Sequence, residues 1–247
     1  MIVRATAIPL AYYPYSSTSL IVHWLTRNQG KISTLLKGAY RTKNRFLGEH
    51  ELFSTTELLY YAKRSDTLYT AKECSMLQRR STFRTDWRAM QTASYISALF
   101  NKTTPEEAPH PELFELYEEL LDLAEKFGRH PQFLIWSELQ FCDHHGHAPY
   151  LDHCLQCSAD KDLRFCSAQG GVVCGSCSKE KKLPTVESPP DVLAILCAWQ
   201  LAEHPSAIVK TQITGQQLTA LNAILTSFMK YQFNLQPHHR NAALQAA

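Results

Sequence analysis

The chain has 247 residues, enough to bury one or two hydrophobic cores. Its apolar content of 45% is ordinary for a globular protein, and no apolar run reaches the ~18 residues that a membrane-spanning helix needs. The N-terminal residues from Met1 to Arg4 show no signal-peptide pattern, so we expect a cytoplasmic protein that does not associate with a membrane.

The net charge of +2 conceals an uneven distribution of charge along the chain. Through Thr103, 15 basic residues stand against 6 acidic ones, whereas the remainder holds 10 basic and 17 acidic residues. A basic half joined to an acidic half indicates that the first half meets a polyanion. Chance segregation of solvated surface charge is the alternative explanation.

Five short strands are predicted within the first 81 residues. In the second of them Leu20, Val22 and Trp24 share one face, and the other face is also largely apolar, as expected in a small barrel. The predicted strands are Val3–Leu10, Ser19–Thr26, Lys31–Lys37, Gly48–Tyr61 and Thr67–Cys74. Five strands without a long helix favour a closed barrel of the OB-fold type.

The rest of the chain is predicted to be helical. Apolar spacing and helix-start signals indicate helices over Asp86–Phe100, Leu113–Ala124, Pro131–Phe141, from Ser188 onward, and Leu218–Phe228. Ser188 is expected to cap its helix, with proline in the first turn, and the tail from Gln236 is expected to be frayed. The predicted fold class is therefore α+β, with a barrel in residues 1–81 and a helical domain in residues 82–247.

Two Cys-x-x-Cys pairs are the most specific motif in the sequence. Cys154 and Cys157 form the first pair, and Cys174 and Cys177 form the second after sixteen intervening residues. Two such turns complete the tetrahedron of a structural zinc site, one Zn²⁺ per chain, within a module at about residues 148–182. A redox dithiol and a pair of disulfides are the alternatives, although a redox motif needs only one pair and the cytosol disfavours disulfides.

The remaining thiols and the nearby histidines are given structural roles. Four cysteines without a partner at ligand spacing are interpreted as small buried residues, and four histidines close to the first pair as surface residues. The cysteines are Cys74, Cys142, Cys166 and Cys197, and the histidines are His144, His145, His147 and His153.

A basic cluster in the barrel is the second candidate site. Lys31 and Lys37 have the same parity on the third predicted strand and would stand roughly 20 Å apart, which suits several phosphates. Tyr40 interleaves with these charges and could stack on a base, whereas Trp24 is assigned to the core. The proposed nucleic-acid-binding residues are Arg27, Lys31, Lys37, Tyr40, Arg41, Lys43 and Arg45.

No catalytic motif accompanies these two sites. The sequence contains no nucleotide-binding phosphate loop, no dinucleotide-binding glycine motif, no nucleophile elbow and no zinc-protease helix motif. Carboxylates that could hold Mg²⁺ are scarce in the basic half. We therefore expect no enzymatic activity.

Two motifs resemble those of the RecO family of bacterial recombination mediators. The first comprises Leu25–Arg27, Gly30–Lys31 and Leu36–Arg41, and the second runs from Gly146–Leu151 into the cysteine pairs. The resemblance covers nearly the whole chain. It implies an OB-fold, a helical domain with an inserted zinc module, and action on the bacterial nucleoid without enzymatic turnover. It also implies binding of single- and double-stranded DNA, strand annealing, and partnership with RecR and the single-strand-binding protein while RecA is loaded.

Two other classes of protein stay open on the sequence alone. A zinc-ribbon scaffold or transcription factor would bind one duplex sequence and protein partners without annealing strands. A nucleic-acid-modifying enzyme with a structural zinc would need a cofactor or a divalent metal, for which no residues are evident. The scarcity of carboxamides beside the basic cluster favours binding that is indifferent to base sequence and steeply dependent on salt.

Overall fold

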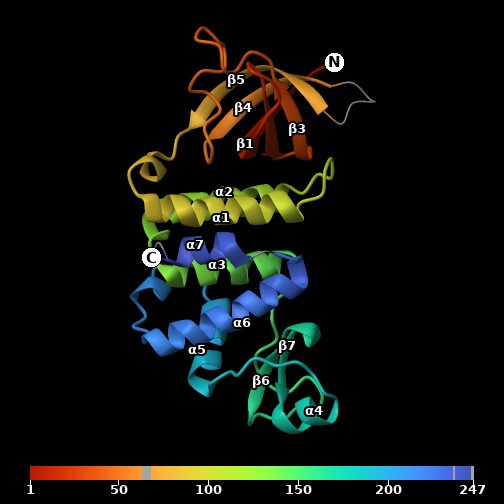
Figure 1. Ribbon diagram of the computed structural model, residues 1–247, viewed down its shortest axis with the longest axis vertical. Helices are drawn as coiled ribbons and strands as arrows, with labels where there is room; N and C mark the ends of the chain where they lie inside the picture. The colour runs from red at the N-terminus through yellow and green to blue at the C-terminus, as the bar shows by residue number, and fades with distance from the viewer. Residues whose placement is uncertain (63–67, 236, 246–247) are drawn as a thin grey trace. The chain divides into compact units, whose positions relative to one another are not determined.

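The computed structural model describes residues 1–62, 68–235 and 237–245. The chain forms two compact units, Met1–Lys126 and Phe127–Ala247. Unit 1 contains a barrel and two long helices, and unit 2 contains the remaining helices and a small cysteine-rich module (Figure 1). Among the described residues, no helix combines the length and the apolar character needed to cross a membrane.

The barrel of unit 1 is closed and five-stranded, which confirms the predicted architecture. Its strands are β1 Ile2–Pro14, β2 Leu20–Thr26, β3 Gly30–Leu36, β4 Thr55–Tyr61 and β5 Leu68–Gln78. They follow one another around the barrel in the order β1-β2-β3-β5-β4. The β3–β5 pairing is parallel and the others are antiparallel, a topology consistent with an OB-fold.

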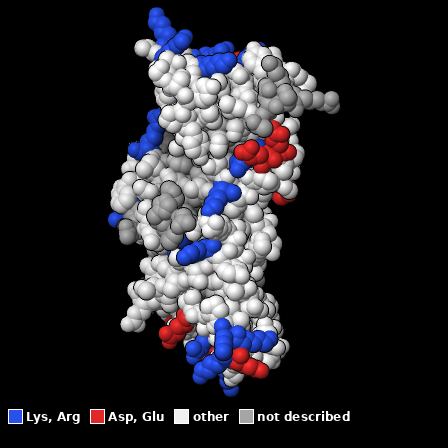
Figure 2. All heavy atoms as spheres, turned by 45° about the vertical axis from the view of Figure 1, so that its right-hand side comes forward, with Lys and Arg blue, Asp and Glu red and all other residues white. Residues whose placement is uncertain are grey.

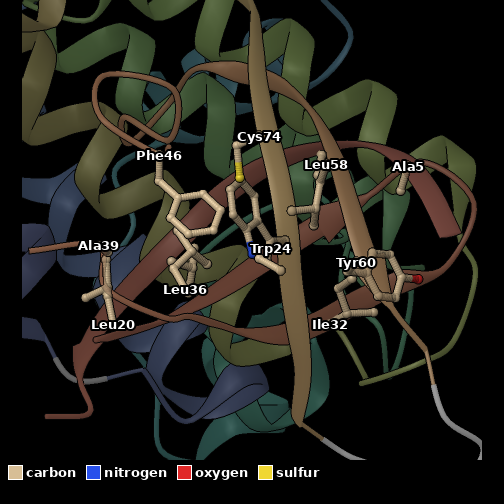
Figure 3. Close-up of a cluster of buried hydrophobic side chains, with 13 residues drawn as sticks. Ala5, Leu20, Trp24, Ile32, Leu36, Ala39, Phe46, Leu58, Tyr60 and Cys74 are labelled. Atoms are coloured by element: carbon tan, nitrogen blue, oxygen red, sulfur yellow. The ribbon is translucent and has the colours of Figure 1, made fainter. Parts of the chain in front are cut away.

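Apolar side chains from all five strands fill the barrel (Figure 3). Trp24 is fully buried at its centre, and its indole N–H donates to Thr34 Oγ1 at 2.8 Å. Because the one polar atom of the ring is satisfied inside the core, Trp24 has a packing role, as the sequence predicted.

The predicted fourth strand is too long at its start. The strand β4 begins only at Thr55, and residues 37–54 form a connection that we call the β3–β4 loop. Gly48 and Phe53 both adopt positive φ angles, 77° and 68°, which a strand cannot accommodate. This loop carries most of the predicted nucleic-acid-binding residues.

Two long helices follow the barrel in the chain, α1 Trp87–Thr103 and α2 Pro111–Phe127. A short 3-10 turn, η1 Ser81–Arg84, comes before them. Asp86 caps α1 by accepting the N–H groups of Arg88 and Ala89. Arg80 joins the barrel to α2, because its fully buried side chain pairs with Asp122 at 2.6 Å. The same guanidinium donates to the backbone oxygen of Phe53 at 2.6 Å, so it also fixes the end of the β3–β4 loop.

Unit 2 is built on five further helical segments. They are α3 Pro131–His144, α5 Pro190–Gln200, η3 Ile208–Lys210, α6 Gly215–Phe233 and α7 Pro237–Gln245. The predicted cap of α5 is wrong: Ser188 Oγ accepts the N–H of Phe165 at 3.0 Å instead, and Pro189 occupies the cap position. A complete capping box of Thr214 and Gln217 begins α6.

The C-terminal tail is a helix, and the prediction of fraying from Gln236 is wrong for the described residues 237–245. Arg240 on α7 is buried and forms a two-pronged ion pair with Glu138 on α3, with N···O distances of 2.7 and 2.9 Å. Thr226 and Asn222 on α6 accept further hydrogen bonds from the guanidinium. A partner distant in sequence therefore orders α7.

The cysteine-rich module lies between α3 and α5 in the chain. It contains a two-stranded antiparallel hairpin of β6 Leu163–Cys166 and β7 Gly171–Cys174, joined by η2 Ser167–Gln169. A short helix, α4 Gly175–Glu180, follows β7 directly. The hairpin places the second cysteine pair at the end of β7 and the start of α4, where it can meet the first pair.

Candidate functional site

Four cysteine side chains converge in the module of unit 2. The Sγ atoms of Cys154, Cys157, Cys174 and Cys177 all lie within 4.8 Å of one another. Cys157 Sγ and Cys174 Sγ are 3.6 Å apart, close to the roughly 3.8 Å edge of a tetrahedron with metal–sulfur bonds of about 2.3 Å. The four sulfurs can therefore hold one tetrahedral metal ion. No other His, Cys, Asp or Glu cluster of this kind occurs among the described residues.

Backbone N–H groups support the sulfurs in both knuckles. The N–H of Gln156 points to Cys154 Sγ at 3.4 Å, and the N–H of Cys177 points to Cys174 Sγ at 3.5 Å. Such donors stabilise thiolates and orient them toward a metal. All four ligand positions come from the protein, so an ion held here would have no open position for a substrate.

The glycines of the module serve close packing more than unusual backbone angles. A Cβ on Gly175 would lie 2.0 Å from Asp162 Oδ2, and one on Gly171 would lie 2.4 Å from the backbone oxygen of Tyr150. Only Gly170 has a positive φ, 73°. Gly170 therefore serves the turn between the two strands, whereas Gly171 and Gly175 allow close contacts that a side chain would block.

The thiols alter one another's ionisation. Burial raises the pKa of the Cys154 thiol, but backbone hydrogen bonds from Cys174 and Gln156 outweigh it and lower that pKa to about 6. Hydrogen bonds with the thiols of Cys174 and Cys157 raise the pKa of Cys177 to about 12. The negative charge on the Cys154 thiolate thus disfavours ionisation of a neighbouring thiol. A divalent cation would offset this repulsion by stabilising all four thiolates.

The other predicted structural cysteines and histidines do not join this cluster. Cys74, Cys142 and Cys166 are buried, as the sequence predicted, whereas Cys197 is only half-buried. The four histidines are exposed or half-buried. His145 stacks on Phe141 with the ring centroids 3.9 Å apart, which gives it a packing role.

The β3–β4 loop presents four cations to solvent in unit 1. Lys37, Arg41, Lys43 and Arg45 are all exposed, and Tyr40 between them is 55% exposed. The first acidic residue of the whole chain comes only after these residues, at position 49. The loop therefore combines dense positive charge with one accessible aromatic ring, the combination used for binding single strands.

Buried anchors hold this loop in a defined shape. Phe46 is fully buried in the barrel core between the exposed residues Arg45 and Leu47. The hydroxyl of Tyr12 on β1 donates to the backbone oxygen of His50, and the imidazole Nδ1 of His50 lies 2.7 Å from Phe46 O. The cations therefore project from an ordered support, which reduces the entropy lost when they contact a ligand.

Lys31 does not belong to this exposed set, and its predicted role in binding phosphate is corrected. The residue is only 8% exposed, and its Nζ donates to the backbone oxygen of Asn101 on α1 at 2.7 Å. Burial lowers the pKa of its ammonium group, which the charge of Glu106 partly offsets. Both faces of β3 are covered, so the strand parity that linked Lys31 to Lys37 does not place them on one open face.

Arg27 is engaged within unit 1. Its guanidinium lies 3.2 Å from Glu118 and 5.1 Å from the ring centroid of Phe114, both on α2. About two fifths of the side chain remains exposed. The positive charge of Arg27 is thus largely compensated by α2, and a phosphate contact would compete with this pairing.

The acidic helix α2 explains the uneven charge of the sequence. Residues 104–126 contain eight acidic residues and one basic residue, whereas residues 127–247 contain nine of each. Glu118 pairs with Arg27, Asp122 with Arg80, and Glu125 accepts the N–H of Thr82. Two of these eight carboxylates therefore compensate basic residues of the same unit, whereas within the described residues the exposed loop cations form no ion pair.

Two family models match the chain over nearly its whole length. The model "Recombination protein O N terminal" matches residues 1–80, and "Recombination protein O C terminal" matches residues 84–241. The chain belongs to the RecO family. The barrel with its β3–β4 loop lies in the first match, and the four-cysteine module lies in the second.

Several curated relatives carry the name "DNA repair protein RecO". The protein of Syntrophus aciditrophicus is 34% identical over 73% of this chain and 69% of its own length. That of Alkaliphilus metalliredigens is 25% identical over 93% of each chain. That of Bacillus pumilus is 28% identical over 88% of this chain and 85% of its own. RecO-family membership thus extends across both units and assigns the chain to DNA repair.

Proposed function

We propose that this RecO-family protein binds single- and double-stranded DNA without sequence preference and anneals complementary strands. In this proposal it acts with RecR to help load RecA onto DNA covered by single-strand-binding protein, in the bacterial cytoplasm and on the nucleoid. No step of this function requires the protein to make or break a covalent bond. The observation that carries the proposal is the exposed cationic β3–β4 loop.

The chemistry of the loop suits phosphates better than base edges. Lys37, Arg41, Lys43 and Arg45 can each neutralise a phosphate, and such contacts carry no sequence information. The carboxamide of Asn44 could have read a base, but its Nδ2 donates to Arg41 O and its Oδ1 accepts the N–H of Phe46. Binding by this loop is therefore expected to tolerate every base.

Annealing follows from the same electrostatics. Two complementary strands repel each other through their phosphates, and cations that neutralise one strand lower the cost of bringing the other close. Tyr40 can stack on an unpaired base without selecting among bases, which would keep a bound strand open for pairing. The barrel thus provides contacts that fit strand pairing and require no turnover.

We also propose that the four-cysteine cluster holds one structural Zn²⁺. Zinc prefers four thiolates in a tetrahedron, whereas Mg²⁺ and Ca²⁺ prefer oxygen ligands. Elemental analysis of the protein purified without added metal should find close to one zinc per chain. A zinc content below about 0.2 per chain, with the four thiols paired as disulfides, would contradict this assignment.

Charge reversal in the loop tests the proposed DNA site. Lys37→Glu with Arg41→Glu should weaken binding of a fluorescent single strand at low salt by about tenfold or more, because attraction is replaced by repulsion. The rate of annealing of two complementary oligonucleotides should fall with it, with and without single-strand-binding protein.

The matched control is Arg88→Glu with Lys126→Glu, which changes the net charge by the same amount at exposed positions on α1 and α2. This pair should bind and anneal nearly as the unaltered protein does. Equal losses in both pairs would mean that overall charge, and not the loop, drives binding. Full binding by the loop variant would place the site elsewhere, and a preference of more than about 100-fold for one duplex sequence would favour a transcription factor.

A further inference from the structure

The basic residues of unit 2 are concentrated on its cysteine-rich module. The unit has nine basic and nine acidic residues, yet five of the basic ones fall between residues 161 and 182. They are Lys161, Arg164, Lys179, Lys181 and Lys182. Figure 2 shows Lys and Arg side chains gathered over this module, at the lower end of the view. A neutral unit thus carries a local excess of positive charge.

Three of these lysines crowd the C-terminal end of α4. Lys179, Lys181 and Lys182 are all exposed. Lys181 reaches the side-chain oxygen of Gln156 in the first knuckle, so the cluster lies beside the cysteine turns. Within the described part of the chain, none of the three ammonium groups forms an ion pair with a carboxylate. Their charges are therefore available to an external anion.

Most acidic side chains of the module lie away from the three lysines, although Glu180 is exposed on α4 between Lys179 and Lys181. A cavity of about 1060 Å³ between the module and the start of α5 is lined by four acidic residues together with Lys161 and Arg164, and by none of the three lysines. These acidic residues are Asp152, Asp160, Asp162 and Glu187. Three lysines against one glutamate leave the end of α4 with a net positive charge.

Compensation of the metal centre does not account for the three lysines. A divalent ion with four thiolates would carry a net charge of −2, but the hydrogen bonds that reach the sulfurs come from backbone N–H groups of Gln156 and Cys177. A lysine near a helix C-terminus also favours the helix dipole, yet α4 is a helix of only six residues and one cation would suffice. Three solvent-facing ammonium groups exceed both needs.

We propose that Lys179, Lys181 and Lys182 form a second nucleic-acid-binding surface, which contacts the phosphates of a DNA strand independently of the β3–β4 loop. Flexible lysine side chains neutralise phosphates without reading bases, so this surface shows no sequence preference. Lys181 contacts Gln156 in the first cysteine turn, and the other two lysines are its near neighbours in sequence. Binding at this surface does not depend on the loop, whereas its use in annealing rests on the proposed function.

Two separate phosphate-binding surfaces on one chain explain how a single molecule can hold two strands. A strand on the β3–β4 loop and a complementary strand on the module are both neutralised and brought to a high effective concentration. Annealing then depends on both surfaces, whereas binding of one short strand requires only one of them. Removing the module lysines therefore slows annealing more than it weakens binding.

The experiment uses the full chain with Lys179→Gln and Lys182→Gln, and measures binding of a fluorescent single strand over a series of salt concentrations. Lys181 is kept because it contacts Gln156. The matched control is Lys210→Gln with Lys230→Gln, two exposed lysines of unit 2 outside the module. With the loop disabled by Lys37→Glu and Arg41→Glu, we expect the slope of log K against log salt for the remaining binding to become shallower by about 1.4 in the first pair only, at about 0.7 per phosphate.

Zinc content and annealing rate complete the test. Both lysine pairs should retain the metal content of the unaltered protein, so that a loss of binding is not a loss of the module. Combining Lys179→Gln and Lys182→Gln with the charge reversals at Lys37 and Arg41 should remove most of the binding that the loop variant retains, because only Lys181 of the module surface remains. An unchanged slope when the module lysines are removed from the loop variant, together with an unchanged annealing rate in the module variant, would overturn this proposal and leave the loop site standing. A loss in the module variant alone would instead overturn the loop site.

Discussion

Lys31 and Lys37 provide a matched pair of substitutions for the DNA-binding surface of the barrel. Lys31 lies near the start of β3 and Lys37 directly follows its last residue, and the sequence assigned both to phosphate binding. In the structure Lys37 is exposed, whereas Lys31 is buried and its Nζ donates to Asn101 O on α1. We expect Lys37→Met to change the salt dependence of DNA binding and Lys31→Met to leave that dependence unchanged.

The magnitude follows from the number of exposed cations. If each of the four loop cations neutralises one phosphate of a single strand, together they contribute a slope of about −2.8 to log K against log salt. Lys37→Met should reduce that contribution to about −2.1. Between 50 and 200 mM salt, the corresponding loss of affinity falls from about 50-fold to about 20-fold. The difference of about 0.7 holds whatever other parts of the chain contribute.

Lys31→Met should instead act on stability. Removing its ammonium group deprives Asn101 O of its donor at the end of α1, which costs about 1–3 kcal/mol of unfolding free energy. Fluorescence anisotropy with a labelled oligonucleotide gives the slopes, and urea unfolding gives the stabilities. A slope that changes equally in both variants would refute the distinction between buried and exposed lysines, and an unchanged slope in Lys37→Met would remove that residue from the site.

Two further predictions concern unit 2. Arg240→Met should lower the free energy of unfolding by about 3–5 kcal/mol, because it removes the guanidinium that pairs with the fully buried Glu138 carboxylate. Adding Glu138→Leu should recover most of that loss in denaturant titrations. No recovery would show that the packing of α7 matters more than the ion pair. The Gly175→Ala variant should lose its bound zinc to a chromogenic chelator faster than the unaltered protein, because the added Cβ would overlap Asp162. The Gly215→Ala variant, whose added Cβ would meet open space, should release zinc at the unaltered rate.

The features that could be predicted from the sequence depend on local patterns. Alternating apolar residues such as Val22 and Trp24 reflect a strand with both faces covered, and the barrel followed from five such segments. The cysteine turns were predictable because two ligands separated by two residues can bind one ion from a single turn, whatever surrounds them. Each of these signals lies within a few consecutive residues.

The features that could not be predicted depend on partners far along the chain. Lys31 can be buried because its ammonium group donates a hydrogen bond to the backbone oxygen of Asn101, which lies seventy residues later in the chain. The helix α7 is ordered because Arg240 pairs with Glu138, which lies about a hundred residues earlier in the chain. The spacing of apolar residues in the tail does not indicate this contact. The start of β4 was misplaced because the predicted strand was extended back to Gly48, whereas Gly48 and Phe53 have positive φ angles that depend on how the loop packs.

Charge counted along the sequence therefore has to be separated into charge that is paired inside a unit and charge that is left for a ligand. The basic N-terminal half suggested a polyanion partner, yet Arg27 and Arg80 are paired with acidic residues of α2. The second half looked acidic, yet its excess lies in residues 104–126, and residues 127–247 are neutral overall. A neutral unit can still present a local excess of exposed cations, as at the end of α4, where three lysines surround one glutamate. The relevant quantity for nucleic-acid binding is the density of exposed, unpaired cations on an ordered support, and by that criterion the β3–β4 loop and the four-cysteine module both qualify.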